Sequence, residues 1–348
     1  MPDNISLSFG GRKITEFSEY SVDSDLYTAG DAFSVTLPDP AFAVNPGQQF
    51  QLFVNDRLEM TGIIDRVSEY NGKDGSRVVV EGRDLLGLVV DSYCEEFITL
   101  EGVTLKVLAE RLLRAVPFIN RKNIEYQAGI AGATASKTGD NDLFDLSQDL
   151  AQIEPGQTVF EVLRDFAESR GAMFFSLPDG TFVFGRPKAK GKPLFTITRR
   201  LDGAGNNVMD GSRVRDISQQ YSKIIVVGQK QGADGIEAAD LNTIAIAQVD
   251  DVPFYKPFVE INNNDLASPA NAGRVIAERQ RAMGLQLSYT TPGHSVNGRN
   301  WAVNELCAVL DEKFEINGTY LIYGRTFRID KSRGPVTELR LGLPGVIR

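Results

Sequence analysis

The alternation of hydrophobic and polar residues predicts short β-strands over the first part of the chain. Apolar residues recur at every second position in 5–9, 33–37 and 50–54, and glycine, proline or Asn/Asp turns separate these stretches. Short strands at this spacing are typical of a small barrel or sandwich. We therefore expect residues 1–97 to form a first β-barrel.

The pattern changes to a helical period over residues 98–190. Apolar residues follow Thr104 and Thr158 at helical spacing, which predicts helices near 104–115 and 158–170. Thr158 and Glu161 have the spacing of a capping box, and Gly171 follows the second helix where a C-terminal cap is expected. A turn around Pro178-Asp179-Gly180 then predicts a hairpin over 173–185. These elements indicate an inserted α/β domain at 98–190.

Strand-like segments return after residue 190 and continue to the end of the chain. We assign residues 191–250 and 285–348 to a second β-barrel, interrupted at 251–284 by a helical insertion. Its helix is expected to begin at Ser268-Pro269 and to end at Gly284. Asn317-Gly318 predicts a tight hairpin turn between strands 313–316 and 319–323.

The two β portions are similar in layout. Both contain a strand, a turn rich in Asn, Asp or Gly, a long middle segment and a closing strand, at 50–82 and at 314–342. Turn residues recur for local reasons, so chance similarity between two β meanders is the competing explanation. We expect a duplication, which gives a β-rich, multidomain α+β protein with two similar small β-barrels, an inserted α/β domain and a helical insertion.

Composition and charge limit the classes of function. The 348 residues include 42% hydrophobic and 24% charged residues, with a net charge of −9, so the chain is globular and lacks the basic surface of a general nucleic-acid binder. The first residues lack a signal-peptide pattern, and the apolar runs are far shorter than the roughly 18 residues of a membrane span. We expect a soluble protein.

The residues that could carry chemistry are few and scattered. His294 is the only histidine, and we expect it in a surface loop, because no Gly-x-Ser-x-Gly motif accompanies it. Cys94 and Cys307 lie outside any Cys-x-x-Cys or Cys/His cluster, so we expect two reduced, buried thiols and no zinc site.

The remaining candidates also favour ordinary structural roles. Asp140, Asp142 and Asp145 could suggest calcium, but the surrounding residues depart from the EF-hand pattern, which favours a solvated acidic loop. Gly203-Ala204-Gly205 lacks the third glycine and the following helix of a dinucleotide loop. Trp301 is expected to fill a core or a subunit interface. We predict no catalytic, cofactor-binding or metal-binding residues, no cofactor, and a protein that is not an enzyme.

Two groups of residues carry a resemblance to a known family. The first group follows a Pro-Gly-x-Thr helix start with an Arg-Gly pair and an Asp-Gly hairpin: Pro155, Gly156, Thr158, Arg170, Gly171, Asp179, Gly180, Gly185, Arg186 and Pro187. The second forms a closing Gly-x-x-Trp-x-x-Asn segment and β meander: Gly298, Trp301, Asn304, Asn317, Gly318, Leu321, Ile322, Leu339 and Leu341. The sequence resembles the baseplate hub proteins of contractile phages, the Mu-like tail proteins, which are related to the base of type VI secretion spike proteins. The resemblance covers 154–187 and 295–346 well and the N-terminal part loosely, and it leaves 120–150 and 229–248 unmatched.

The resemblance implies a structural function. Hub proteins of this kind look like two related β-barrels with inserted domains, and three copies form a ring of six barrels that docks a sixfold tube. It implies a homotrimer that contacts the tail tube, the central spike and baseplate wedge proteins. The expected location is the tail baseplate of a virion, assembled in the host cytoplasm, with DNA passing through the channel without specific binding and no small-molecule substrate.

Two alternatives remain open at this stage. One is a cell-wall-degrading tail hydrolase that uses a carboxylate pair, because 46 Asp and Glu residues do not exclude such a pair. The other is the base of a type VI secretion spike. Such proteins normally continue into a long β-helical spike, whereas this chain stops at Arg348, so we expect the hub.

Overall fold

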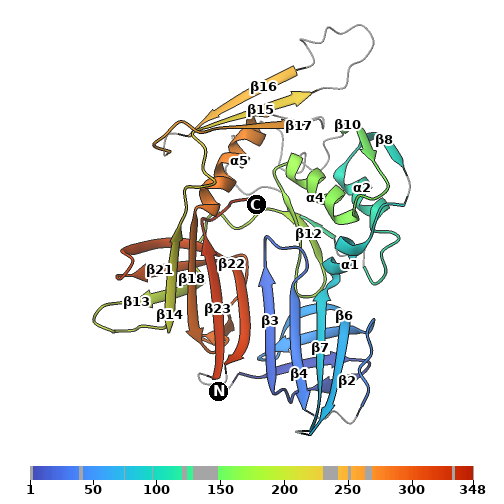
Figure 1. The fold of residues 1–348 in the computed structure, drawn as a ribbon, viewed down its shortest axis with the longest axis vertical. Helices are drawn as coiled ribbons and strands as arrows, with labels where there is room; N and C mark the ends of the chain where they lie inside the picture. Colours follow the sequence, from blue (N-terminus) through green and yellow to red (C-terminus); the bar gives the residue numbers. More distant parts are fainter. Residues whose placement is uncertain are drawn as a thin grey trace.

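The computed structural model describes residues 3–38, 42–73, 75–95, 97–119, 124–127, 148–229, 242–249, 252–262, 269–330 and 334–347. Two β-rich halves lie side by side in the lower part of Figure 1, and the described helices lie above them. The protein is therefore a β-rich α+β fold, as the sequence pattern predicts.

A 13-stranded sheet runs through both halves. Its continuous path has the order β14-β18-β23-β22-β3-β4-β7-β6-β5-β1-β2, with β21 pairing β22 and β13 pairing β21 off this path. Every neighbouring pair on the path is antiparallel. The strands of the first half are β1 (Ile5–Phe9), β2 (Arg12–Ile14), β3 (Glu19–Asp25), β4 (Ala32–Pro38), β5 (Gln49–Val54), β6 (Arg57–Gly72) and β7 (Gly75–Asp84). Those of the second half are β13 (Phe195–Arg199), β14 (Asp210–Arg215), β18 (Leu285–Pro292), β21 (Glu305–Asp311), β22 (Ile316–Asp330) and β23 (Gly334–Gly342).

The two halves have the same strand order. The order β3-β4-β7-β6-β5-β1 in the first half corresponds to β14-β18-β23-β22-β21-β13 in the second, and both sets also follow this correspondence along the chain. One pair differs in direction, because β1 and β5 are antiparallel whereas β13 and β21 are parallel.

The expectation of two separate small barrels needs correction. Within the described residues, neither half closes into a barrel, and the halves are joined by antiparallel pairing of β22 with β3. They also share one core, in which Phe33, Phe50 and Val80 of the first half cluster with Phe327 and Leu339 of the second. Edge strands that pair with each other hide their backbone groups from solvent, which explains why the sheet is continuous.

The inserted α/β part packs around a second core. Its helices are α1 (Leu85–Asp91), α2 (Leu105–Leu112) and α4 (Val159–Ser169), and its strands are β8 (Ile98–Val103), β9 (Ile124–Tyr126), β10 (Gln148–Ile153), β11 (Met173–Ser176) and β12 (Phe182–Gly185). The predicted capping box is confirmed, because Thr158 Oγ1 accepts from Glu161 N at 3.1 Å and the Glu161 carboxylate accepts from Thr158 N at 2.9 Å. Leu163 of α4 and Phe174 of β11 are buried in this core.

A small sheet covered by one helix lies apart from the 13-stranded sheet. It has the order β16-β15-β17, formed by β15 (Lys223–Gln229), β16 (Asn242–Gln248) and β17 (Pro257–Asn262), with α5 (Pro269–Met283) below it in Figure 1. The sequence pattern assigned the residues of β15 and β16 to the second β-barrel, which is wrong. Instead, β15 pairs with β16 on one side and with β17 on the other, and α5 buries one face of β15 at Ile224 and Val226. The expected helix cap Ser268 lies outside the described residues.

The predicted turn at Asn317-Gly318 is also displaced. Both residues lie within β22 and pair with β21, and the turn falls at residues 312–315 instead. The Asp311 carboxylate accepts from Lys313 N at 3.0 Å and from Phe314 N at 3.2 Å, which fixes the earlier turn. The short pair β19 (Ser295–Val296) and β20 (Arg299–Asn300) completes the described strands.

Candidate functional site

A buried ion pair joins the two β halves. Arg325 Nη1 on β22 lies 2.5 Å from Glu59 Oε2 on β6, and the two side chains are only 3% and 9% exposed. Arg325 also donates to the backbone oxygen of Trp301 at 2.8 Å and to Ser24 Oγ at 3.0 Å. A buried charge requires a charged partner and hydrogen bonds, and this pair has both.

A row of amide side chains extends the pair toward the N-terminus. Asn300 Nδ2 donates to Glu59 Oε1 at 2.6 Å and to Val54 O at 2.8 Å. Asn55 Nδ2 donates to Asn300 Oδ1 at 3.1 Å and to Asp3 Oδ1 at 2.8 Å. We call the residues Asp3, Ser24, Asn55, Glu59, Asn300 and Arg325 the polar seam.

His294 belongs to the boundary between the halves and not to a surface loop, so that expectation is wrong. Its side chain is 0% exposed, and Nε2 lies 2.8 Å from Tyr20 Oη of the first half. Its Nδ1 lies 3.2 Å from Thr337 Oγ1 of β23, and its backbone N–H donates to Asp3. Burial lowers the pKa of His294 to about 4, so the ring is neutral at pH 7 and serves as a hydrogen-bonded core residue.

Trp301 fills the shared core beside the polar seam. It is 1% exposed, and its ring centroid lies 4.8 Å from that of Phe195 on β13. This position confirms the expectation of a core residue. Gly298 and Asn304, which flank it in the closing motif, adopt positive φ values of 71° and 59°. Asn304 Oδ1 accepts from Lys188 N at 2.8 Å, so the motif connects the second half to the end of the α/β part.

A second buried polar group lies where the first half meets the α/β part. Asp84 caps α1 by accepting from Leu86 N at 3.1 Å, and Ser176 of β11 donates to its other oxygen. Asp31 accepts from Asp25 N at 2.9 Å. Burial raises the pKa of both Asp31 and Asp84 above the ordinary carboxyl value, with mutual repulsion adding to the effect at Asp31. These carboxyls are therefore packing and capping groups of a junction.

The motif residues of the α/β part are packing and capping groups too. Gly171 has φ 66° after α4, and its carbonyl accepts from the guanidinium of Arg186. Arg170 Nη1 donates to Phe166 O at 3.0 Å. The resemblance in this segment therefore rests on residues that fix the α4–hairpin unit.

The other candidates show no assembled reaction centre. Cys94 and Cys307 are buried free thiols. Gly203 and Gly205 occupy an exposed turn with φ values of 77° and 70°. Asp140, Asp142 and Asp145 lie outside the described residues. Within the described part of the chain, no group of three or more His, Cys, Asp or Glu side chains has the arrangement of a metal site.

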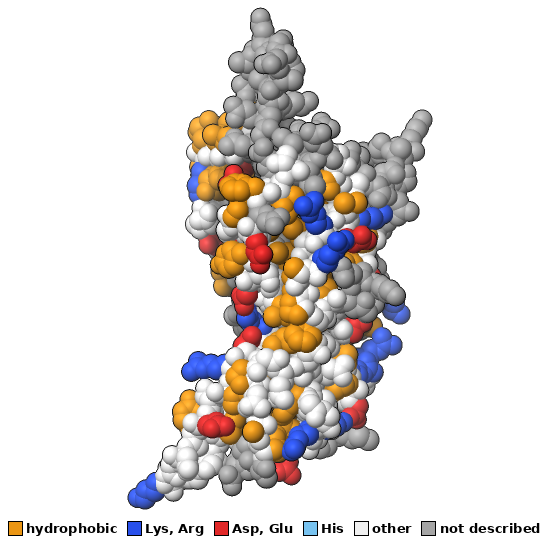
Figure 2. All heavy atoms as spheres, turned by 90° about the vertical axis from the view of Figure 1, so that its right-hand side faces the viewer, with side chains coloured by type: hydrophobic (Ala, Val, Ile, Leu, Met, Phe, Trp, Pro, Cys, Tyr) orange, Lys and Arg blue, Asp and Glu red, His pale blue; other side chains and the backbone are white. Residues whose placement is uncertain are grey.

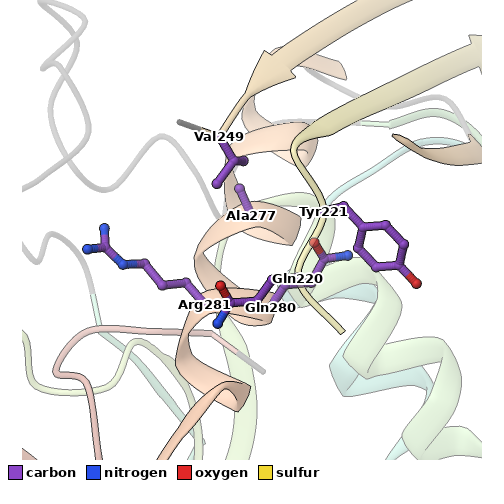
Figure 3. Close-up of a pocket in the computed structure, with 6 residues that line it drawn as sticks. All are labelled: Gln220, Tyr221, Val249, Ala277, Gln280 and Arg281. Carbon is purple, nitrogen blue, oxygen red and sulfur yellow. The ribbon is translucent and has the colours of Figure 1, made fainter. Parts of the chain in front are cut away.

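One shallow cavity lies between α5 and the start of β15. It is open to solvent, and Figure 3 shows Gln220, Tyr221, Ala277, Gln280 and Arg281 around it, together with Val249. The Tyr221 ring and the Arg281 side chain extend away from each other in this view. The lining includes no carboxylate, histidine or thiol, so it offers no nucleophile or general base.

Exposed apolar side chains gather on the outer face of the β16-β15-β17 sheet. Ile246, Ile225 and Val259 form one cross-strand row, and Ile244, Val227 and Ile261 form the next. The side chains on the two outer strands are exposed by 53% to 68%. By contrast, Figure 2 shows hydrophobic, acidic and basic side chains interspersed over the flank that carries β6. Among the described helices, none has the length and apolar character needed to span a bilayer.

The sequence pattern gave no signal for the polar seam. Glu59 and Arg325 are 266 residues apart, and each stands in an ordinary alternating strand. The one local hint was the Gly-x-x-Trp-x-x-Asn stretch, which contains Asn300 of the seam, but the pattern assigned no role to Asn300.

Comparisons with known proteins agree with this geometry. Residues 4–84 match the family model for the N-terminal part of the Mu phage baseplate assembly protein GpP-like family. The chain is 22% identical over 361 residues to the baseplate hub protein gp44 of Escherichia phage Mu, covering 98% of this chain and 88% of that protein.

Two solved structures share the fold over nearly their whole lengths. The tail protein from Neisseria meningitidis MC58 has a TM-score of 0.82 at 23% identity, covering 98% of this chain and 97% of that chain. The 43 kDa tail protein of prophage MuSo2 from Shewanella oneidensis has a TM-score of 0.77 at 19% identity, with 97% and 98% covered. The resemblance to Mu-like phage tail proteins is thus confirmed, and residues 4–84 carry the GpP-like N-terminal domain of Mu phage baseplate assembly proteins.

Proposed function

We propose that this chain is a structural hub protein of a contractile-tail baseplate, in which three copies form a ring that joins the tail tube to the central spike. The observation that carries the proposal is the alignment of nearly the whole chain with the Mu baseplate hub protein. The proposed location is the virion tail, after assembly in the host cytoplasm. The proposed partners are the tube, spike and wedge proteins.

The distribution of polar groups supports a structural function. Two of the buried charged groups, Glu59 and Arg325, are paired with each other and bridge the two halves. A reaction centre requires polar groups that face a substrate cavity. The family and the three proteins to which this chain is similar are baseplate and tail proteins, and none of them is named as an enzyme.

We propose further that the two β halves arose by duplication. The shared strand order, the long middle strands β6 and β22, and the irregularity in each of them support this. On this proposal the first module is the β part of 1–97, which ends with β7, and the second consists of those strands of 191–250 and 285–348 that lie in the 13-stranded sheet. The α/β part, which begins at α1, and the segment that carries β15, β16, β17 and α5 are insertions. Two features of the described strands depart from the repeat: β13 pairs in parallel with β21, and β2 has no counterpart in the second half.

Light scattering after size-exclusion chromatography tests the proposed trimer. We expect a mass three times that of the 38.2 kDa chain at micromolar concentration, and a hollow threefold ring in electron micrographs viewed down the axis. A stable monomer would count against the hub. A peptidoglycan zymogram tests the hydrolase alternative, because clearing that disappears after a single Asp or Glu substitution would overturn the structural function.

A further inference from the structure

The registers of the two halves define which residues are equivalent. In the first half, Phe33 of β4 pairs with Gly82 of β7, and in the second Leu287 of β18 pairs with Leu341 of β23. Both middle strands have a bulge, after Ile64 in β6 and after Ile322 in β22. Aligning the two bulges makes Ile64 equivalent to Ile322. The ladder registers then make Val80 equivalent to Leu339 and Phe33 equivalent to Leu287.

This correspondence extends to the strands at the junction. Residues 66–70 of β6 correspond to residues 324–328 of β22, counted from the bulge. Residues 21–25 of β3 correspond to residues 212–216. Phe33 and Leu287 are equivalent, so their pairing partners Val22 and Arg213 are equivalent as well. Within the chain, 324–328 of β22 pair with 21–25 of β3, and this pairing joins the halves.

The equivalent segments have no such partner in the described part of one chain. β7 pairs with one side of residues 66–72, whereas β5 pairs only as far as Ile63 on the other side. β14 ends the path of the sheet and pairs only with β18. Figure 1 shows β14 and β6 on opposite flanks of the two halves. A head-to-tail contact that closes into a ring uses two different surfaces of each copy, and these surfaces lie on opposite flanks.

Building on the trimer proposed above, we infer that β14 of one copy pairs antiparallel with the outer part of β6 of the next copy. This contact repeats between chains the β3–β22 junction that forms once within each chain. The equivalence between the two halves determines which residue of β14 faces which residue of β6. The resulting pairs are Arg66–Asp216, Val67–Arg215, Ser68–Val214, Glu69–Arg213 and Tyr70–Ser212.

The side chains in this register are complementary. Arg66 faces Asp216 and Glu69 faces Arg213, so two of the five pairs join opposite charges and none joins like charges. Opposite charges directly across two strands favour pairing. Arg66 is already 3.7 Å from Glu81 across an exposed pair, and Arg213 donates to Phe314 O at 2.6 Å. Each guanidinium has five donors, so both keep donors for the new partner.

The contact also covers exposed apolar surface. Val214 is 50% exposed and Tyr70 is 48% exposed in the single chain. Five paired residues bury far less than the roughly 800 Å² per partner of a stable interface. The β14–β6 contact therefore sets the register and direction of a larger interface.

Disulfide trapping tests the register directly. Ser68→Cys and Val214→Cys together place two thiols directly across the proposed pair, where the Cα separation of about 4.5–5.5 Å suits a disulfide. Because the contact is head-to-tail, mild oxidation of the double variant is expected to give covalent trimers on a non-reducing gel. Each single variant stays uncrosslinked, and so does the wild type, whose Cys94 and Cys307 are buried. Ser68→Cys with Ser212→Cys is the matched off-register control and is expected to crosslink far less.

Charge exchange gives a second measurement. Arg66→Glu is expected to weaken the trimer about tenfold, and adding Asp216→Arg is expected to restore most of it. Circular dichroism checks that each variant folds.

The outcomes separate this inference from the proposed function. A trimer by light scattering without crosslinking in the Ser68→Cys/Val214→Cys variant overturns the β14–β6 contact and leaves the hub intact. Crosslinking in a single variant also overturns it, because the contact would then be symmetric. A wild-type monomer at every concentration overturns both.

Discussion

Removing Arg325 should destabilise the protein more than any single surface change, because it leaves Glu59 as a buried charge. Arg325→Ala deletes the 2.5 Å contact to Glu59 and the hydrogen bonds to Trp301 O and Ser24 Oγ. Only the Asn300 amide then remains beside the carboxylate. Breaking one partner of a buried pair costs about 3–5 kcal/mol, and we expect about 4 kcal/mol here.

The double variant Glu59→Met/Arg325→Met provides the internal comparison. It removes both charges and keeps similar side-chain volume, so its cost should be about 1–2 kcal/mol, below that of either single change. The exposed control is Arg274→Ala on α5, whose ion pair with Glu278 is 47% and 46% exposed. That control should cost no more than about 0.5 kcal/mol.

Urea unfolding measures these costs. Trp301 is the only tryptophan and lies in the shared core beside the polar seam, so its fluorescence reports the separation of the two halves. Far-UV circular dichroism follows the sheet in the same samples. A cost below about 1 kcal/mol for Arg325→Ala, or a double variant whose cost equals the sum of the two single changes, would refute the assigned function of the pair.

Three further perturbations test other parts of the structure. His294→Gln should reduce the pH dependence of the free energy of unfolding between pH 6.5 and 4. In that range the unfolded wild-type chain binds a proton at His294 that the buried ring does not bind, so wild-type stability falls by up to about 3 kcal/mol as pH falls. The raised pKa values of Asp31 and Asp84 act in the opposite direction in both proteins. Thr158→Ala should cost about 1 kcal/mol in thermal unfolding through loss of the capping box, and a cost near zero would show that the cap is dispensable. Gly62→Ala should cost at least about 3 kcal/mol, because the new Cβ would lie 1.9 Å from the backbone oxygen of Arg83, whereas Gly72→Ala meets nothing within 4 Å and should change stability little.

Local patterns predicted the elements whose cause is local. The helix beginning after Thr158 follows from a capping box and an apolar stripe within twelve residues. The turn at Asn55-Asp56 has both residues at positive φ, as a two-residue hairpin turn requires. Such features depend on neighbours in sequence, so the sequence is sufficient to place them.

The wrong predictions all involve competition or distant partners. Asn317-Gly318 is a strong turn signal, but the Asp311 carboxylate captures two backbone amides earlier and moves the turn. His294 was expected at the surface because no catalytic motif accompanies it, and Tyr20, its partner across the boundary, is 274 residues away. The polar seam was not predicted for the same reason, because its residues come together only when the two halves pack against each other.

The junction within each chain and the proposed junction between chains form at different stages of assembly, and the exposure of their charged residues differs accordingly. Within one chain the β3–β22 junction forms once, during folding, and its charged pair is sealed from solvent with every partner at hand. The proposed β14–β6 junction must form between chains that have already folded, so its charges have to be stable in water beforehand. Arg66 is 71% exposed, in line with this requirement. Exposed charges steer association and are screened by salt, whereas buried ones are not. Raising the salt concentration should therefore weaken the contact between copies while leaving the joined halves of each chain unchanged.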